Sequence, residues 1–149
     1  MEQSSIVDTR RQELASASVH RLQIEVSKLP QYEPKTTHYF ADGMYCREVW
    51  RAADVVVVGK VHKKEHFYVI ASGTVLIKSD EGVQEVSGPC VMVSRPGTKR
   101  AVYSITETTC LTFHRTDKTD LDEIEAELIE DDPEAMYTAA NMQKARVLK

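Results

Sequence analysis

Seven short apolar segments, separated by turn residues, occupy the middle of this 149-residue chain and decide which folds it can adopt. They are rich in Val, Ile, Tyr and Phe, and no stretch of helical period lies between them. Clusters such as Asp80-Glu81-Gly82 and Arg95-Pro96-Gly97 supply the turns. The pattern predicts a small antiparallel sandwich or barrel. The segments are Met44–Trp50, Val55–Val61, His66–Leu76, Val83–Val86, Cys90–Val93, Ala101–Ile105 and Cys110–His114.

Helical patterns flank these strands. Between Glu13 and Leu29 the apolar residues recur at spacings of four and three, which predicts one amphipathic helix that ends before Pro30. Its stripe must pack against the barrel or against the same helix of another subunit. The residues of the stripe are Ala15, Val19, Leu22, Val26 and Leu29.

A second helical pattern follows the last strand. Asp120 precedes the apolar positions Leu121, Ile124 and Leu128, and Asp132-Pro133 predicts a further helix start. We therefore divide the chain into an N-terminal helical arm (1–37), a β-barrel (38–115) and an acidic helical tail (116–149). The fold class predicted is mainly β with helical extensions.

Composition excludes several classes of protein. The net charge is −4, from 19 basic and 23 acidic residues, and the acids concentrate in the tail, so there is no basic stripe for a nucleic acid. No apolar run approaches the roughly 20 residues of a membrane-spanning helix, and the first residues lack the apolar part of a secretion signal. We expect a cytoplasmic protein. Its three cysteines lack metal-site spacing and are expected to be buried thiols.

Two stretches resemble the motifs of the cupin superfamily. Residues 59–73 (GKVHKKEHFYVIASG) are similar to the first motif, in which a glycine precedes two histidines and a glutamate. Residues 88–100, ending RPGTKR, are similar to the second motif, which normally ends P-x-G-x-x-H. The chain also resembles small cupin-like proteins of bacteriophages and prophages over about residues 38–130. The resemblance implies a jelly-roll barrel, and a phage-encoded chain would act in the host cytoplasm or associate with the virion.

The chain departs from the cupin pattern at the metal ligands. Lys60 stands at the first histidine position and Arg100 at the histidine of the second motif, whereas His66 stands at the glutamate position. Because charged Lys and Arg only donate hydrogen bonds, they cannot bind a metal, and the usual four-ligand site is not expected. If residues 63–65 form a tight turn, His62 and His66 oppose each other. His114 can then complete a three-histidine site suited to Zn, Fe or Ni; the alternative is that these are hydrogen-bonded barrel residues.

Strand alternation places Lys60 and His62 on one face, which is the barrel interior if the register follows the cupin pattern. Buried cations need an anion, either a carboxylate of the chain or a small anionic ligand. The chain's own candidates are Asp42, Glu48 and Glu65. If the register is shifted by one residue, the two cations face solvent instead.

Three functions remain open. The first is a binding module for a small anionic ligand, including nucleotide-like ones, at Lys60, His62, His66 and Arg100. The second is a metal-dependent or acid–base enzyme in the same pocket; resemblance to metal-free jelly-roll sugar isomerases implies His62 or His66 as base and Tyr68 or Tyr103 as acid. The third is a structural or virion-associated protein that acts through its helical arms. We also expect a homo-oligomer, formed through the N-terminal helix or the barrel.

Overall fold

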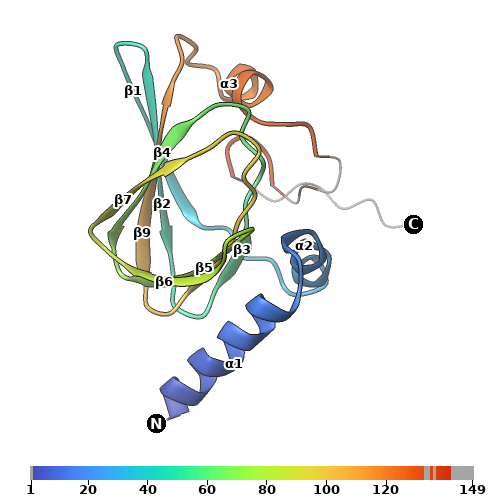
Figure 1. Ribbon diagram of the computed structural model, residues 1–149. Coiled ribbons are helices and arrows are strands. Elements are labelled where there is room, and N and C mark those ends of the chain that lie inside the picture. Colours follow the sequence, from blue (N-terminus) through green and yellow to red (C-terminus); the bar gives the residue numbers. More distant parts are fainter. Residues whose placement is uncertain (1, 133–134, 136, 142–149) are drawn as a thin grey trace.

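The computed structural model describes residues 2–132, 135 and 137–141 (Figure 1). Its helices are α1 (Glu2–Ser16), α2 (Val19–Ser27) and α3 (Leu121–Leu128). The strands are β1 (Lys35–Ala41), β2 (Met44–Arg51), β3 (Val56–Val58), β4 (His66–Ser72), β5 (Thr74–Ser79), β6 (Gly82–Ser87), β7 (Cys90–Ser94), β8 (Ala101–Ser104) and β9 (Thr108–Arg115).

The strands form two antiparallel sheets that face each other. One has five strands in the order β1-β2-β9-β4-β7, and the other has four in the order β3-β8-β5-β6. Alternate residues of both sheets fill the space between them, as expected for a two-layer β fold. This core consists of Tyr68, Ile70, Val75, Ile77, Val102 and Cys110. The prediction of a mainly β jelly-roll-like domain is thereby confirmed.

The segment predicted as one strand from His66 to Leu76 is in fact two strands, divided at Gly73. Gly73 has a φ of +89°, and a Cβ there would lie 2.3 Å from the carbonyl oxygen of Glu107. The close approach of another backbone therefore requires glycine and lets the chain pass from one sheet to the other. The predicted strand from Val55 to Val61 is also shorter, because the chain leaves the sheet after Val58.

Strand β1 was not among the predicted segments. It pairs along its whole length with β2, from Lys35 opposite Trp50 to Ala41 opposite Met44. Asp42 and Gly43 form the connection, both with positive φ, as a two-residue hairpin turn requires. The turn predicted at Ala41-Asp42-Gly43 is therefore confirmed. The strand before it was not predicted because its first residues are polar.

The prediction of one continuous N-terminal helix over Glu13–Leu29 is wrong, because the segment contains parts of two helices. Ser18 starts a new helix, because its backbone is extended and its hydroxyl accepts a hydrogen bond from the amide of Arg21. Ala15 and Leu29 are exposed, whereas the other stripe residues pack on the outer face of the four-stranded sheet. Helices α1 and α2 together bury Leu14, Val19 and Leu22. These side chains pack against Val58, Leu76, Ala101 and Tyr103 of the sheet. The stripe thus packs within the chain.

Helix α3 agrees with its prediction. The Asp120 carboxylate caps it by accepting from the amide of Glu123, and Ile124 and Leu128 are buried against Tyr45. The further helix predicted from Asp132 falls partly on residues 133–134, 136 and 142–149, which lie outside the described residues; residues 137–141 form a bridge and a turn. Within the described part of the chain, no helix has the length and apolar character needed to cross a membrane.

Candidate functional site

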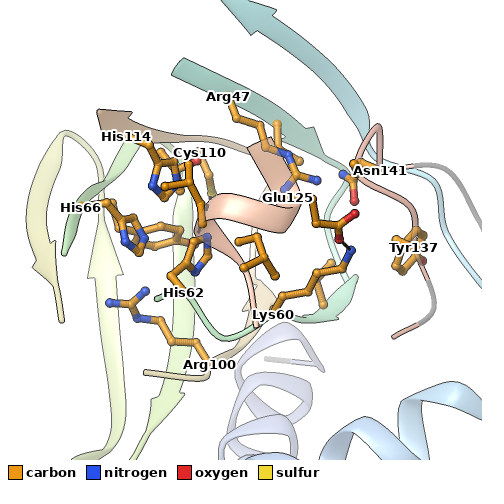
Figure 2. A pocket seen from close by; sticks show the side chains of 18 of the residues that line it. Arg47, Lys60, His62, His66, Arg100, Cys110, His114, Glu125, Tyr137 and Asn141 are labelled. Carbon is orange, nitrogen blue, oxygen red and sulfur yellow. Dashed lines mark hydrogen bonds and ion pairs between the residues drawn. The ribbon is translucent and has the colours of Figure 1, made fainter. Parts of the chain in front are cut away.

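A cavity of about 150 Å³ lies between the two sheets and beneath α3 (Figure 2). Strand β2 contributes Tyr45, Arg47 and Arg51 to its lining, and β4 contributes His66 and Tyr68. Further side chains come from β9, from the two segments that carry the cupin-like motifs, from β3 and β8, from α3, and from the segment after α3 that includes Tyr137 and Asn141. The cavity is therefore built where the predicted motifs meet the strands around them.

Three histidines meet at one side of this cavity. His62 follows β3, His66 begins β4 and His114 lies near the end of β9. Their ring centroids are 4.2 Å apart for His62 and His66, 4.3 Å for His66 and His114, and 5.0 Å for His62 and His114. One nitrogen of each ring lies within 4.8 Å of the others. The bend at residues 63–64 brings the first two rings together, as expected from a tight turn at residues 63–65, although the bridge partner of His62 is Ile129.

These imidazoles are held neutral. Burial is the largest cause of the low pKa of His62, about 2, and of His114, about 3, and the neighbouring rings add to it. Burial also lowers the pKa of His66, whose Nδ1 lies 3.1 Å from the carbonyl oxygen of Lys64. If that nitrogen donates, Nε2 of His66 keeps its lone pair; this atom is buried and has no hydrogen-bond partner. Neutral rings with free lone pairs fit a divalent metal ion.

Three arginines also line the cavity: Arg51 is buried, and Arg47 and Arg100 are half-buried. Arg47 and Arg51 lie four residues apart on β2 and point to the same side of the sheet. The Nε atoms of both are buried and have no hydrogen-bond partner. Arg100 lies over the ring of Tyr68, with 4.9 Å between its Cζ and the ring centroid. Burial lowers the pKa of Arg47 and of Arg100 from the usual arginine range, but both stay charged.

Only one carboxylate lies among the described residues of the cavity lining. Glu125 of α3 forms an ion pair with Lys60, and the two side chains are 31% and 19% exposed (Figure 2). No described carboxylate is within ion-pair distance of Arg47, Arg51 or Arg100. Lys60 therefore has a carboxylate in an ion pair, whereas the three arginines have none among the described residues, and Glu125 acts on Arg47 only from a longer distance. None of the partners predicted from the sequence, Asp42, Glu48 and Glu65, pairs with Lys60.

Tyr68 and Cys110 form the floor of the cavity. The Tyr68 hydroxyl lies 3.8 Å from the Cys110 sulfur, and Arg51 Nη1 lies 3.9 Å from the same sulfur. Burial raises the pKa of Tyr68 to about 12. The phenol is therefore protonated at neutral pH and donates toward sulfur.

The structure brings five of the predicted site residues, namely Lys60, His62, His66, Arg100 and His114, to one cavity, and Tyr68 with them. Tyr103 lies elsewhere: its ring is under the N-terminal helices and its hydroxyl donates to Asp54. Sequence reasoning missed Arg47, Arg51 and Glu125. Alternation along the predicted strand Met44–Trp50 already placed Tyr45, Arg47 and Val49 on one face and could have found the first arginine.

No protein-family model and no curated protein matches this sequence. Solved structures share the fold. The cupin domain of Cnp3 from Schizosaccharomyces pombe matches with a TM-score of 0.50 and 14% identity, over 62% of this chain and 72% of that one. An RmlC-like cupin from Shewanella frigidimarina matches with a TM-score of 0.50 and 11% identity, over 59% of this chain and 80% of that one. At such identities the similarity concerns the fold alone: this chain has a cupin-like jelly-roll fold.

Proposed function

We propose that the chain is a binding module for a small anion, which sits in the barrel cavity between the arginines and the three histidines. The observation that carries this proposal is a set of three cavity-lining guanidinium groups, buried Arg51 and half-buried Arg47 and Arg100, none of which forms an ion pair with a described carboxylate. A buried charge costs several kcal/mol unless a counter-charge or hydrogen bonds compensate it. An anion in the cavity supplies both, because guanidinium binds carboxylate and phosphate oxygens in pairs.

The size of the cavity suits a compact anion. Its volume of about 150 Å³ accommodates a small carboxylate or a phosphate. A compact anion is therefore the first candidate, and the nucleotide-like ligand predicted from the sequence is the alternative.

The histidines support a metal-dependent version of the same function. His62, His66 and His114 have the donor set of a facial three-nitrogen site for Zn, Fe or Ni, and the unpartnered Nε2 of His66 fits a coordinating role. A divalent ion at this trio would act as a Lewis acid on a bound oxyanion. Arg47 and Arg100, which lie near the histidines, would orient that anion. Enzymatic use of the pocket is thus the second candidate function, and it depends on the histidines rather than on Tyr103.

A thermal-shift series with chelator-treated protein tests anion binding. Inorganic phosphate and malonate are the probes, and chloride at equal ionic strength is the control. A ligand at 100 times its Kd adds about 2.7 kcal/mol to the free energy of unfolding, so a clear rise in Tm is expected. Arg47→Leu should abolish the rise, whereas Arg95→Gln, which changes an exposed arginine, should retain it. No rise with either anion would contradict the proposal.

Elemental analysis tests the metal separately. After incubation with Zn²⁺ and desalting, wild-type protein should retain about one ion per chain, and His66→Asn should retain almost none. Retention of metal without any anion response would favour a metal site alone. Cytoplasmic location, phage origin, virion association and the absence of nucleic-acid binding stay predictions from the sequence.

A further inference from the structure

The outer face of the five-stranded sheet carries most of the exposed large hydrophobic side chains of the described chain. Seven of eleven such residues lie there, and their exposed fractions run from 37% to 66%. The strands bring them together from five separate stretches of sequence. They are Tyr39, Met44, Trp50, Phe67, Val91, Val93 and Phe113, and we call them the apolar sheet face.

Strand register makes this face continuous. Tyr39 lies opposite Cys46, Cys46 opposite Phe113, Phe113 opposite Phe67, and Phe67 opposite Val93. One row of side chains therefore crosses all five strands. Side chains directly opposite each other in neighbouring strands are in contact range, so the row presents one apolar surface.

Helices cover the apolar outer face of the four-stranded sheet. There α1 and α2 cover Leu76 and Tyr103 (Figure 1). Helix α3 packs on Tyr45, which points to the inner side of the five-stranded sheet. Among the described residues, no helix covers the apolar sheet face. The N-terminal helices thus pack on the four-stranded sheet of the same chain, and the apolar sheet face of the other sheet stays uncovered by the described helices.

We propose that a second copy of this chain covers the apolar sheet face in a two-fold symmetric dimer. A whole aromatic side chain offers about 150–250 Å², so exposed fractions of 37% to 66% leave roughly 500 Å² of apolar surface on the seven side chains together. Half-exposed Cys46, Val69 and Leu111 extend the same surface. The total approaches the roughly 800 Å² that each partner buries in a stable interface. Two such faces pack with the spacing of stacked sheets, about 10 Å.

Charge also favours a second copy. A two-fold interface brings identical patches together, so any charge at its centre meets its own sign. The charged residues at outward positions of the five strands are Lys35, Glu48 and Arg115, all on the half formed by β1, β2 and β9. Outward positions of β4 and β7 carry no charge. The half around Phe67, Val91 and Val93 can therefore pair with itself without like-charge repulsion.

Sedimentation equilibrium of the full chain at micromolar concentration tests the dimer. Wild-type protein should have twice the 16.8 kDa chain mass. Phe67→Glu should give the monomer mass with an unchanged far-UV circular dichroism spectrum, because the side chain is 51% exposed and its loss leaves no cavity. Leu29→Glu, which changes an exposed leucine outside the face, should remain a dimer. A monomeric wild type would overturn the proposal, as would a dimer that survives Phe67→Glu together with Val91→Glu.

Thiol labelling gives a second readout without any substitution in the interface. Cys46 lies in the apolar row, whereas Cys90 is opposite Ile70, whose side chain is in the core. Alkylation of Cys46 by a maleimide should slow several-fold as the concentration rises through the dimer Kd. Cys90 should react at a constant rate. Equal behaviour of the two thiols at all concentrations would contradict a dimer through this face.

Discussion

The ammonium group of Lys60 forms an ion pair with the carboxylate of Glu125 on α3. Lys60 occupies a position where the resemblance to cupins implies a histidine ligand. The chain carries a cation at this position and pairs it with a carboxylate of α3. The ion pair holds α3 against the cavity. It also neutralises the ammonium group of Lys60, which therefore attracts an anionic ligand less.

Breaking this pair should destabilise the protein. Glu125→Gln leaves a largely buried ammonium group without its partner, and we expect the free energy of unfolding to fall by about 1–2 kcal/mol after allowance for partial exposure. Chemical denaturation measures the change. Glu123→Gln, at an exposed position of the same helix, is the matched control and should have little effect. Equal effects of the two substitutions would show that the pair contributes nothing.

Replacing Arg47 should separate stability from binding. In anion-free buffer, Arg47→Leu removes a half-buried guanidinium group that forms no ion pair and whose Nε is buried without a partner, so we expect the free energy of unfolding to rise by about 1–2 kcal/mol. The same variant should no longer be stabilised by phosphate or malonate. Denaturant titrations with and without malonate measure both effects. A variant that is less stable without anion and still gains from malonate would contradict this role.

Acid should destabilise the metal-free protein before its carboxylates titrate. The pKa values of His62 and His114, about 2 and about 3, lie below the usual histidine value of 6.5, so the unfolded chain binds more protons than the folded chain as pH falls below 6.5. Each histidine can contribute about 1.4 kcal/mol per pH unit. We expect a loss of about 2–4 kcal/mol between pH 6.5 and 4.5 in chelator-treated protein.

Denaturant titrations across this pH range check that loss. His20→Gln changes an exposed histidine and should leave the pH dependence unchanged, whereas His114→Gln should make it shallower. A free energy of unfolding that stays level from pH 6.5 to 4.5 would mean that the trio accepts protons in the folded state.

Gly73 should tolerate no side chain. Gly73→Ala places a Cβ 2.3 Å from a backbone oxygen at a positive φ, so β4 or β9 must shift, and we expect a loss of at least about 3 kcal/mol. Gly82→Ala is the control, because Gly82 also has a positive φ but has open space around its Cα. Its cost should be near 1 kcal/mol. Thermal denaturation of both variants distinguishes crowding from φ strain.

Local patterns located most of the strands because their apolar residues and turn residues are strong signals, but they missed the largely polar β1. They failed where long-range contacts decide, as at Gly73, whose role depends on residues more than thirty positions away. The division of the N-terminal helix at Ser18 had a local signal, a capping serine, but the apolar spacing continued across it. The spacing of apolar residues by three and four could not distinguish one helix from two.

In the candidate site, too, local patterns were predictable and long-range contacts were not. The three histidines were candidates from the sequence because His62 and His66 lie in the first motif, where a tight turn at residues 63–65 would bring them together, and His114 lies on the predicted last strand. The pairing of Lys60 with Glu125 was not, because the two residues are 65 positions apart and the second belongs to a helix outside the barrel. Arg51 lies one residue beyond the predicted end of its strand, so its orientation could not be read from the alternation.

Isothermal titration calorimetry of malonate into wild-type protein and Arg47→Leu tests the central claim most directly. The account predicts saturable binding of about one malonate per wild-type chain, with affinity at least tenfold weaker in the variant, a difference of about 1.4 kcal/mol. Arg95→Gln should bind like wild type. Equal affinity in wild type and Arg47→Leu, or no heat of binding for malonate or phosphate, would contradict an anion site built by the buried arginines.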